Sequence, residues 1–365
     1  MTQETNPAPQ GFGARKIIII LAGVLLVAGT TFSVYSFFFK KEEIPQVIDL
    51  SLPTQIKRVS DDLIISATIT KENKIKYYTT DKGKVFESIF RADMPYHDSV
   101  LVSSADLTGL TSVLWSPIDK NKVISIFNNK KSFYDFTTNV STKLNQNIDW
   151  IAWSPIYNKI AYQYSDQENN SNNISIANPD GSNWEDIFQT RMNNLIIEWP
   201  SENKISLKSK TNTPNQSDFY ILDISSKKIN KILEKKYGLL VVWSPKGDKI
   251  LFSETNPAGD DPMLKILDLN NNTIKDLDIT TTAEKCVWGK DNLTLFCAIP
   301  QDIIPVEDQF WKINSDTLEA NVYKQQGYGY GTEIPFEASD IVISPSEDYL
   351  IFINEKNMLL HSMSL

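Results

Sequence analysis

One stretch decides the fold of this 365-residue chain: Val242-Trp243-Ser244-Pro245-Lys246-Gly247-Asp248-Lys249-Ile250-Leu251-Phe252. It contains an apolar run that ends in a bulky residue, then a polar turn, then a second apolar run. This pattern predicts two short strands joined by a tight turn. The same phrase returns between residue 68 and the C-terminus, with steps of 38 to 55 residues between equivalent positions.

The copies of the phrase share a bulky residue before the turn and an apolar run after it. They start at Thr68, Trp115, Trp153, Trp199, Trp243, Trp288 and Ile343. Repeats near 40 to 50 residues with four short strands each are typical of β-propeller blades, and seven blades need roughly 315 residues. The sequence therefore predicts an all-β, seven-bladed β-propeller over residues 54–365.

The repeat resembles the WSPDG-type blade of TolB-like and WD40-like propellers, most clearly in residues 243–252. The resemblance covers residues 60–365 and implies the architecture, whereas function varies widely among proteins with this fold. We expect neither the additional α/β domain of TolB before residue 60 nor a hydrolase domain after Leu365. The Gly-His and Trp-Asp pairs of true WD40 repeats are also missing.

The last copy ends after a third strand near residues 359–361, while residues 55–59 resemble an outermost strand without a blade of their own. We therefore predict that this N-terminal segment supplies the fourth strand of the last blade and closes the ring, since closure removes unpaired edges. A chain that enters at an outermost strand enters at the bottom face. The opposite, top face would then carry the long loops between second and third strands and between blades.

Residues 17–39 form a stretch of twenty-three residues without a charge, flanked by Arg15-Lys16 and Lys40-Lys41. A helix of this length spans a bilayer core of about 30 Å. A cleaved signal peptide is the alternative, but its apolar region would be shorter. We predict a disordered cytoplasmic tail at 1–16, a transmembrane helix at 17–39 and a linker at 40–53. The propeller would lie outside the cytoplasm, on a single-pass protein of the cell membrane.

The formal net charge is −9. Nucleic-acid binding needs clustered Lys and Arg, so we expect no nucleic-acid partner.

Few residues are suited to nucleophilic or metal chemistry. His97 and His361 are the only histidines, no Gly-x-Ser-x-Gly elbow occurs, and the two cysteines lack zinc-ligand spacing. We therefore predict no catalytic triad, no metal and no cofactor. His361 falls on an expected edge strand, where a structural role is favoured.

Cys286 and Cys297 lie on either side of the turn at residues 289–294. If Trp288 faces Leu295, each step away from the turn places Val287 opposite Phe296 and then the two cysteines opposite each other. Such a pair is within reach of a disulfide. The alternative is two buried free thiols.

The five tryptophans at equivalent positions are predicted to fill the space between neighbouring blades. Binding residues are expected in the top-face loops, because long loops on a rigid scaffold commonly carry function. The candidates are Asp260, Asp261, Glu307, Asp308, Tyr328, Tyr330 and Phe336.

These observations favour a non-catalytic, membrane-anchored scaffold that binds a protein or an envelope polymer on its top face. The alternative is a propeller enzyme of the lyase or glycosidase type that uses carboxylates in the central channel. Ser112, Val113 and Val241, as expected channel residues, argue against that alternative. A transmembrane sensor is a further alternative, but a tail of sixteen residues leaves no output domain.

Overall fold

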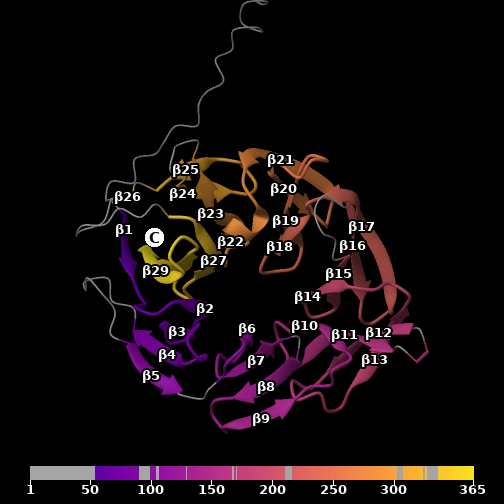
Figure 1. Ribbon diagram of the computed structural model, residues 1–365. Helices are drawn as coiled ribbons and strands as arrows, with labels where there is room; N and C mark the ends of the chain where they lie inside the picture. Colours follow the sequence, from indigo (N-terminus) through magenta and orange to yellow (C-terminus); the bar gives the residue numbers. More distant parts are fainter. Residues whose placement is uncertain are drawn as a thin grey trace, which may run out of the picture. The chain divides into compact units, whose positions relative to one another are not determined.

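The described residues form seven sheets arranged around an open centre, and their strand pairs are antiparallel except for one at the outer edge of the last sheet (Figure 1). The computed structural model describes residues 54–89, 99–103, 107–128, 130–166, 168–169, 171–209, 216–301, 307–323, 325–326 and 336–365. The chain divides into units 1–46 and 47–365, and every described residue belongs to the second. The predicted seven-bladed β-propeller is confirmed, and with it the architecture that the TolB-like and WD40-like resemblance implies.

The first six blades each contain four strands in chain order, from the centre outward, and the seventh contains five strands, two of which come from earlier parts of the chain. The first four blades are β2 (Ile64–Ile69), β3 (Lys74–Thr79), β4 (Val85–Ile89), β5 (Ser99–Ser103); β6 (Leu110–Trp115), β7 (Lys122–Phe127), β8 (Lys130–Asp135), β9 (Val140–Lys143); β10 (Ile148–Trp153), β11 (Ile160–Asp166), β12 (Ser171–Ala177), β13 (Glu185–Thr190); and β14 (Leu195–Ser201), β15 (Lys204–Ser209), β16 (Gln216–Asp223), β17 (Lys228–Tyr237).

The remaining blades are β18 (Leu240–Trp243), β19 (Lys249–Glu254), β20 (Met263–Asp268), β21 (Thr273–Thr280); β22 (Cys286–Trp288), β23 (Thr294–Pro300), β24 (Asp308–Asn314), β25 (Ala320–Val322); and β27 (Ala338–Ile343), β28 (Tyr349–Asn354), β29 (Leu359–Ser364) with β1 (Thr54–Arg58) and β26 (Gln325–Gln326). A short 3-10 turn, η1 (Ala283–Lys285), precedes β22.

The turn of the repeated phrase is held by its serine. Gly247 donates its backbone N–H to the carbonyl of Ser244 at 2.9 Å, and Gly247 has a φ of +64°, a conformation that glycine adopts without strain. The hydroxyl of Ser244 accepts a bond from the N–H of Lys249 and donates to Asp248, both at 3.0 Å. The phrase thus specifies the hairpin between the first two strands of a blade.

The N-terminal strand closes the ring as predicted. β1 pairs antiparallel with β29, with Arg58 opposite His361 and Ile56 opposite Met363. β29 therefore lies between β28 and β1, so His361 is not on an edge strand. The short β26 adds a fifth strand that pairs in parallel with β1, and this addition was not predicted.

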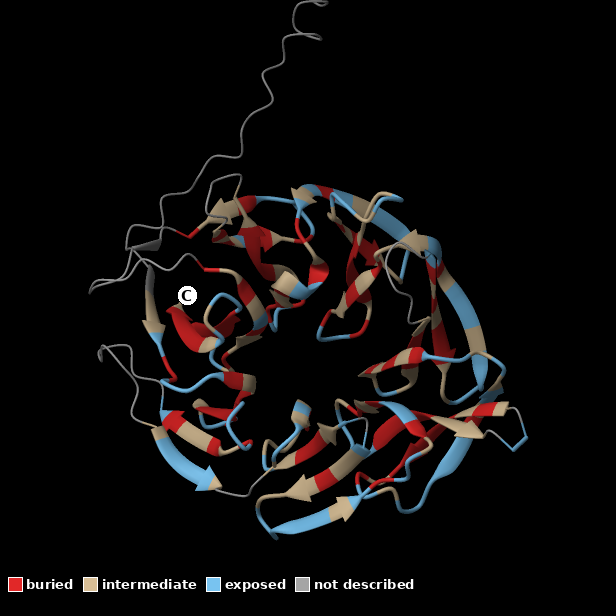
Figure 2. Cartoon of the chain, viewed as in Figure 1, coloured by how far each residue is buried: buried red, intermediate tan, exposed pale blue. Residues whose placement is uncertain are grey.

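The tryptophans of the repeat join neighbouring blades, as predicted. The indole of Trp115 donates to Oγ of Ser66 on β2 at 3.1 Å. Trp153 donates to the carbonyl of Leu114 on β6 at 3.0 Å. These two indoles thus reach the innermost strand of the preceding blade, and the apolar cores between blades are buried (Figure 2).

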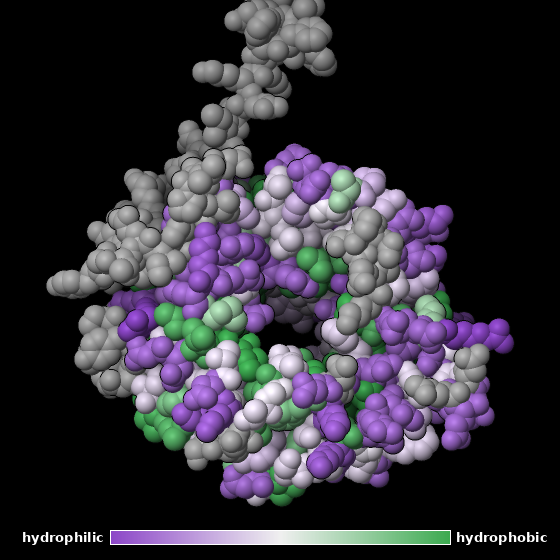
Figure 3. All heavy atoms as spheres, in the orientation of Figure 1, coloured by the Kyte–Doolittle hydropathy of each residue, from purple (hydrophilic) through white to green (hydrophobic). Residues whose placement is uncertain are grey.

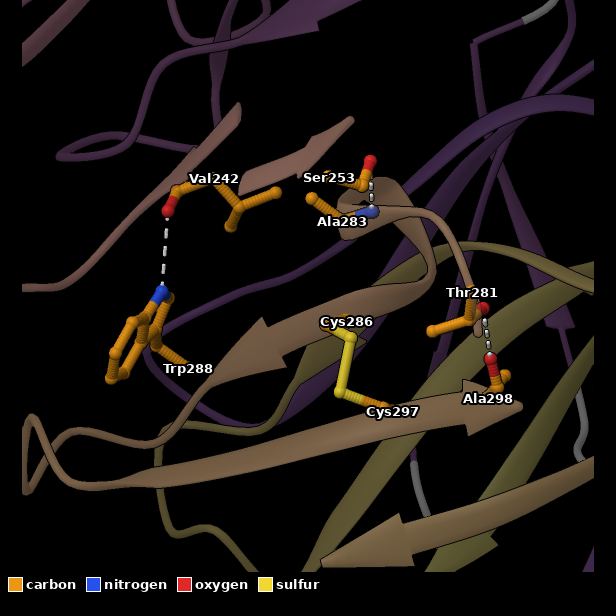
Figure 4. The surroundings of a disulfide bond; sticks show 8 residues. All are labelled: Val242, Ser253, Thr281, Ala283, Cys286, Trp288, Cys297 and Ala298. Atoms are coloured by element: carbon orange, nitrogen blue, oxygen red, sulfur yellow. Dashed lines mark hydrogen bonds between the residues drawn. A yellow bond between two sulfur atoms is a disulfide. The ribbon is translucent and has the colours of Figure 1, made fainter. Parts of the chain in front are cut away.

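The predicted disulfide is present in the sixth blade (Figure 4). Cys286 lies opposite Cys297, one step beyond Val287 opposite Phe296, as the predicted register requires. The two Cα atoms are 4.1 Å apart and both side chains are buried.

The predicted transmembrane helix at 17–39 lies outside the described residues. Among the residues that are described, no helix has the length and apolar character needed to cross a bilayer.

Candidate functional site

The predicted top-face residues occupy different environments. Asp260 and Asp261 are exposed on the loop between β19 and β20, where the side chain of Asn256 bonds to both residues. Asp261 and Lys285 line one cavity of about 590 Å³ between the fifth and sixth blades. Glu307 is half-buried just before β24. Tyr328 and Tyr330 lie outside the described residues, so their role stays a prediction.

Asp308 is not available as a surface contact, which corrects one prediction. Its side chain is fully buried, and its carboxylate pairs with Nζ of Lys285 at 2.8 Å. The same carboxylate accepts the backbone N–H of Ala338 at 2.7 Å. Asp308 therefore links the sixth blade to the innermost strand of the seventh.

Phe336 is a core residue, which corrects a second prediction. Its side chain is only 4% exposed, and its ring packs edge-on against Phe352 at 5.5 Å and His361 at 5.4 Å. Its carbonyl accepts the N–H of Asp308 at 2.8 Å. Asp308 and Phe336 therefore lie together, but their contact joins the sixth and seventh blades and is not part of an exposed binding surface.

The central channel presents a different set of side chains. Its mouth is visible as the hollow at the centre of Figure 3. On the seven innermost strands, all of which are described, the exposed residues are Thr111, Asp149, Trp150 and Asp340. Every one of them lies within a register irregularity of its strand pair. Bulges turn side chains away from the regular alternation, and here they turn them toward solvent.

Two of the residues expected in the channel lie elsewhere, so they do not exclude channel carboxylates. Val113 and Val241 are buried between blades. Asp149 and Asp340 are exposed because the bulges shift the alternation, and a register shift leaves no signal in the local pattern.

Glu198 is a third carboxylate on an innermost strand. It lies half-buried on β14, opposite Ser206 of β15. Its Oε2 accepts hydrogen bonds from Nε1 of Trp243 at 3.1 Å and from Oγ of Ser206 at 3.2 Å. Donors from two blades therefore hold one oxygen of this carboxyl group in place.

The surroundings of Glu198 favour its protonated form. Burial raises the pKa of Glu198, and the carboxylate of Glu284 adds to the rise, whereas Lys208 and the two hydrogen bonds oppose it. Burial lowers the pKa of Lys208, whose ammonium donates to the carbonyl of Leu239 at 2.9 Å. Glu198, Lys208 and Glu284 therefore form one interacting group of charges.

Two further acids, Glu284 and Asp340, lie on or against the innermost strands. Glu284 is exposed on η1, which packs against the innermost strands β18 and β27. Asp340 lies on β27 with a φ of +48°. Water reaches its side chain, yet the surrounding protein and the nearby Glu355 raise the pKa of Asp340. Backbone conformations of this kind are concentrated at functional sites. We call Asp149, Glu198, Glu284 and Asp340 the channel acids.

Two further cavities lie between blades rather than in the channel. They have volumes of about 570 and 530 Å³ and flank the second blade. In the second of them, the carboxylate of Asp186 accepts bonds from Ser175 at 2.6 Å and Asn173 at 3.0 Å. The carboxylate of Asp186 is thus engaged within its own blade.

The sequence matches no family model and no curated protein. In fold, the oligogalacturonate lyase of Vibrio parahaemolyticus is similar, with 9% identity, a TM-score of 0.56, and coverage of 85% of this chain and 91% of that one. An oligogalacturonate lyase in complex with manganese is similar with 9% identity and a TM-score of 0.59, and the match covers 86% of this chain and 90% of that one. The C-terminal WD40 domain of Sif2 is similar with 10% identity and a TM-score of 0.53, and the match covers 86% of this chain and 99% of that one. At these identities the likeness shows the fold alone.

The comparison corrects the interpretation of the chain as a non-catalytic scaffold. That interpretation depended on the absence of a triad and of a hydrolase domain. The match spans 91% of a chain described as a lyase, so a propeller of this extent can be an enzyme without a separate hydrolase domain. The fold by itself is compatible with enzymes and with non-enzymatic propellers.

The manganese of the second lyase has no matching set of ligands here. Among the described residues, no three or more His, Cys, Asp or Glu side chains are grouped so as to hold a metal ion. His361 is buried against aromatic rings, and burial lowers its pKa to about 4. The described part of the chain does not fit a manganese site.

Proposed function

We propose that this protein is a propeller enzyme of the glycosidase type, with its active site at the top mouth of the axial channel. The observation that carries the proposal is the pair formed by Glu198 and Glu284. One carboxyl group is shielded and has a raised pKa, and the other is exposed to water and adds to that rise through its charge. Two carboxyl groups in contrasting environments are the requirement for acid and base catalysis of glycoside cleavage.

The roles follow from the two environments. Glu198 gives its proton to the leaving oxygen as the glycosidic C–O bond breaks. Glu284 takes a proton from the water that adds to the sugar carbon, so the reaction consumes one water. Trp150, 37% exposed beside Asp149 on β10, offers an aromatic wall to a sugar ring.

The charge of the site sets the substrate class. The channel acids make the mouth electronegative, and the whole chain carries a net charge of −9. A polyuronate would be repelled by these carboxylates, whereas a neutral or amino-sugar glycan would not. We therefore expect a neutral or amino-sugar oligosaccharide, in contrast to the uronate named for the two lyases.

The test is a panel of neutral, amino-sugar and uronate oligosaccharides, analysed by mass spectrometry for shortened products. Wild-type protein should shorten a neutral or amino-sugar member with addition of one water. Glu198→Gln should lose this activity, because an amide cannot donate the proton. Glu319→Gln is the matched control, since Glu319 is exposed beside β25, and it should stay active. Cleavage of no member by wild type, or equal cleavage by Glu198→Gln, contradicts the proposal.

A membrane location is part of the same proposal. The charge-free residues 17–39 support an anchor, and the disulfide supports an oxidising compartment. A Leu318→Cys variant provides an exposed thiol on the propeller. A membrane-impermeant maleimide should label it in intact cells, and labelling only after permeabilisation contradicts an outside location.

A further inference from the structure

The outer strand of the first blade differs from the others in its exposed side chains. β5 pairs on its inner side with β4 and, among the described residues, has no strand on its outer side. Val100, Leu101 and Val102 are 68%, 48% and 43% exposed. The strand is pale blue in Figure 2, and apolar atoms gather at the same part of the rim in Figure 3.

Charged residues protect most of the other outer strands. β17 carries Lys228, Lys231, Lys235 and Lys236, and β21 carries Lys275, Asp276 and Asp278. Charges on an edge strand discourage pairing with another chain. β5 has no charged residue, so its open edge lacks this protection.

The sequence of β5 is also suited to pairing with itself. It reads Ser-Val-Leu-Val-Ser, which is the same in both directions. Antiparallel pairing about a two-fold axis at Leu101 places Leu101 opposite Leu101, Val100 opposite Val102 and Ser99 opposite Ser103. Apolar side chains then meet only apolar ones, and the strand gains a neighbour on its outer side. The same arrangement of β21 about Asp276 would place two carboxylates face to face.

We propose that β5 is the contact for a second copy of this chain, which forms a two-fold dimer by edge-to-edge pairing at Leu101. The contact lies on the outer rim and does not depend on the proposed active site at the channel. A stable dimer commonly buries about 800 Å² per partner, which five residues alone do not supply. The association is therefore expected to be weak and dependent on concentration.

A cysteine on the two-fold axis tests the proposal with the full chain in detergent. In Leu101→Cys the two introduced residues would face each other with Cα atoms about 4.5–5.5 Å apart, which suits a disulfide. The native cysteines are already joined and buried, so they do not compete. Ile274→Cys, 51% exposed on the outer strand β21, is the matched control. Mild oxidation should give a covalent dimer of Leu101→Cys many times faster than of Ile274→Cys.

A second variant separates this contact from association elsewhere in the chain. Leu101→Lys places two ammonium groups on the axis and should shift the sedimentation equilibrium toward monomer, with an unchanged melting curve. The proposal is overturned if Leu101→Cys cross-links no faster than the control. It is equally overturned if wild type and Leu101→Lys show the same mass at every concentration. A Leu101→Lys protein that loses vesicle binding while wild type stays monomeric would assign the edge to lipid and reject the dimer.

Discussion

The indole Nε1 of Trp243 donates a 3.1 Å hydrogen bond to Oε2 of Glu198, so a residue of the fifth blade fixes the carboxyl group of the fourth. Two of the equivalent tryptophans, Trp153 and Trp288, donate to a backbone carbonyl instead, as Trp288 does to Val242 at 3.3 Å (Figure 4). The indole hydrogen bond that joins neighbouring blades is here donated to an ionisable side chain. The contact between Trp243 and Glu198 therefore contributes both to the packing of neighbouring blades and to the proposed chemistry.

Replacing Trp243 by Phe should raise the pKa of Glu198 further, because the lost hydrogen bond lowers that pKa. The alkaline limit of activity should shift to higher pH, and stability should fall by about 1–3 kcal/mol from the lost bond and packing. Trp288→Phe is the matched control, since it loses similar packing and a bond to a carbonyl. Carboxyl-carbon NMR of ¹³C-labelled glutamate measures the shift. An unchanged Glu198 pKa in Trp243→Phe contradicts the assignment.

Replacing Glu198 by Gln should leave the protein equally or more stable at pH 7. The folded-state pKa of Glu198 is raised, so its stabilising contribution is complete below the unfolded pKa and is lost as pH rises through the folded pKa. The neutral amide avoids this loss and can still accept the bond from Trp243. Thermal melts of both proteins at pH 4 and pH 7 provide the measurement. A Glu198→Gln protein that is less stable than wild type at pH 7 would contradict the raised pKa.

His361 should make the propeller sensitive to acid. Burial lowers its pKa from 6.5 to about 4, so the unfolded chain takes up the proton first as pH falls. The contribution of the neutral His361 to the free energy of unfolding is complete above pH 6.5 and is lost as pH falls toward 4. The total loss is roughly 3 kcal/mol. Urea unfolding of wild type and His361→Gln across this range isolates the effect. Parallel pH profiles for the two proteins would show that His361 does not titrate as described.

Removing the disulfide should weaken the sixth blade without changing its register. The cysteines are 11 residues apart, and closing a loop of this size stabilises by about 2–3 kcal/mol. A Cys286→Ala, Cys297→Ala protein should therefore melt several degrees below wild type. Wild type should resist a reducing agent under native conditions, since both sulfurs are buried. Identical melting of the two proteins would mean that the bond does not form.

The fold could be predicted because its determinants are local. The Ser244 turn is built from residues within five positions of one another, and the pairing of Cys286 with Cys297 follows from one short hairpin. Phe336 could not be placed in the same way. Its partners Phe352 and His361 arrive from other strands, and nothing in its own loop marks it as buried.

Two of the channel acids could not be placed from the local sequence either. Asp149 and Asp340 reach solvent through bulges, and the alternation of the local sequence does not show where a register shift occurs. Glu198 could have been noticed, because it is a charged residue that directly precedes the repeated Trp199 in an otherwise apolar run. A carboxylate on a strand predicted to be innermost was the available signal.

The most direct test of the central claim compares wild type and Glu198→Gln on the same oligosaccharide, with affinity and turnover measured side by side. If Glu198 is the acid at the channel mouth, both proteins bind with similar dissociation constants, while turnover by the variant falls by about 10²–10⁴-fold. Turnover that survives the substitution, or binding that is lost together with it, would contradict that role.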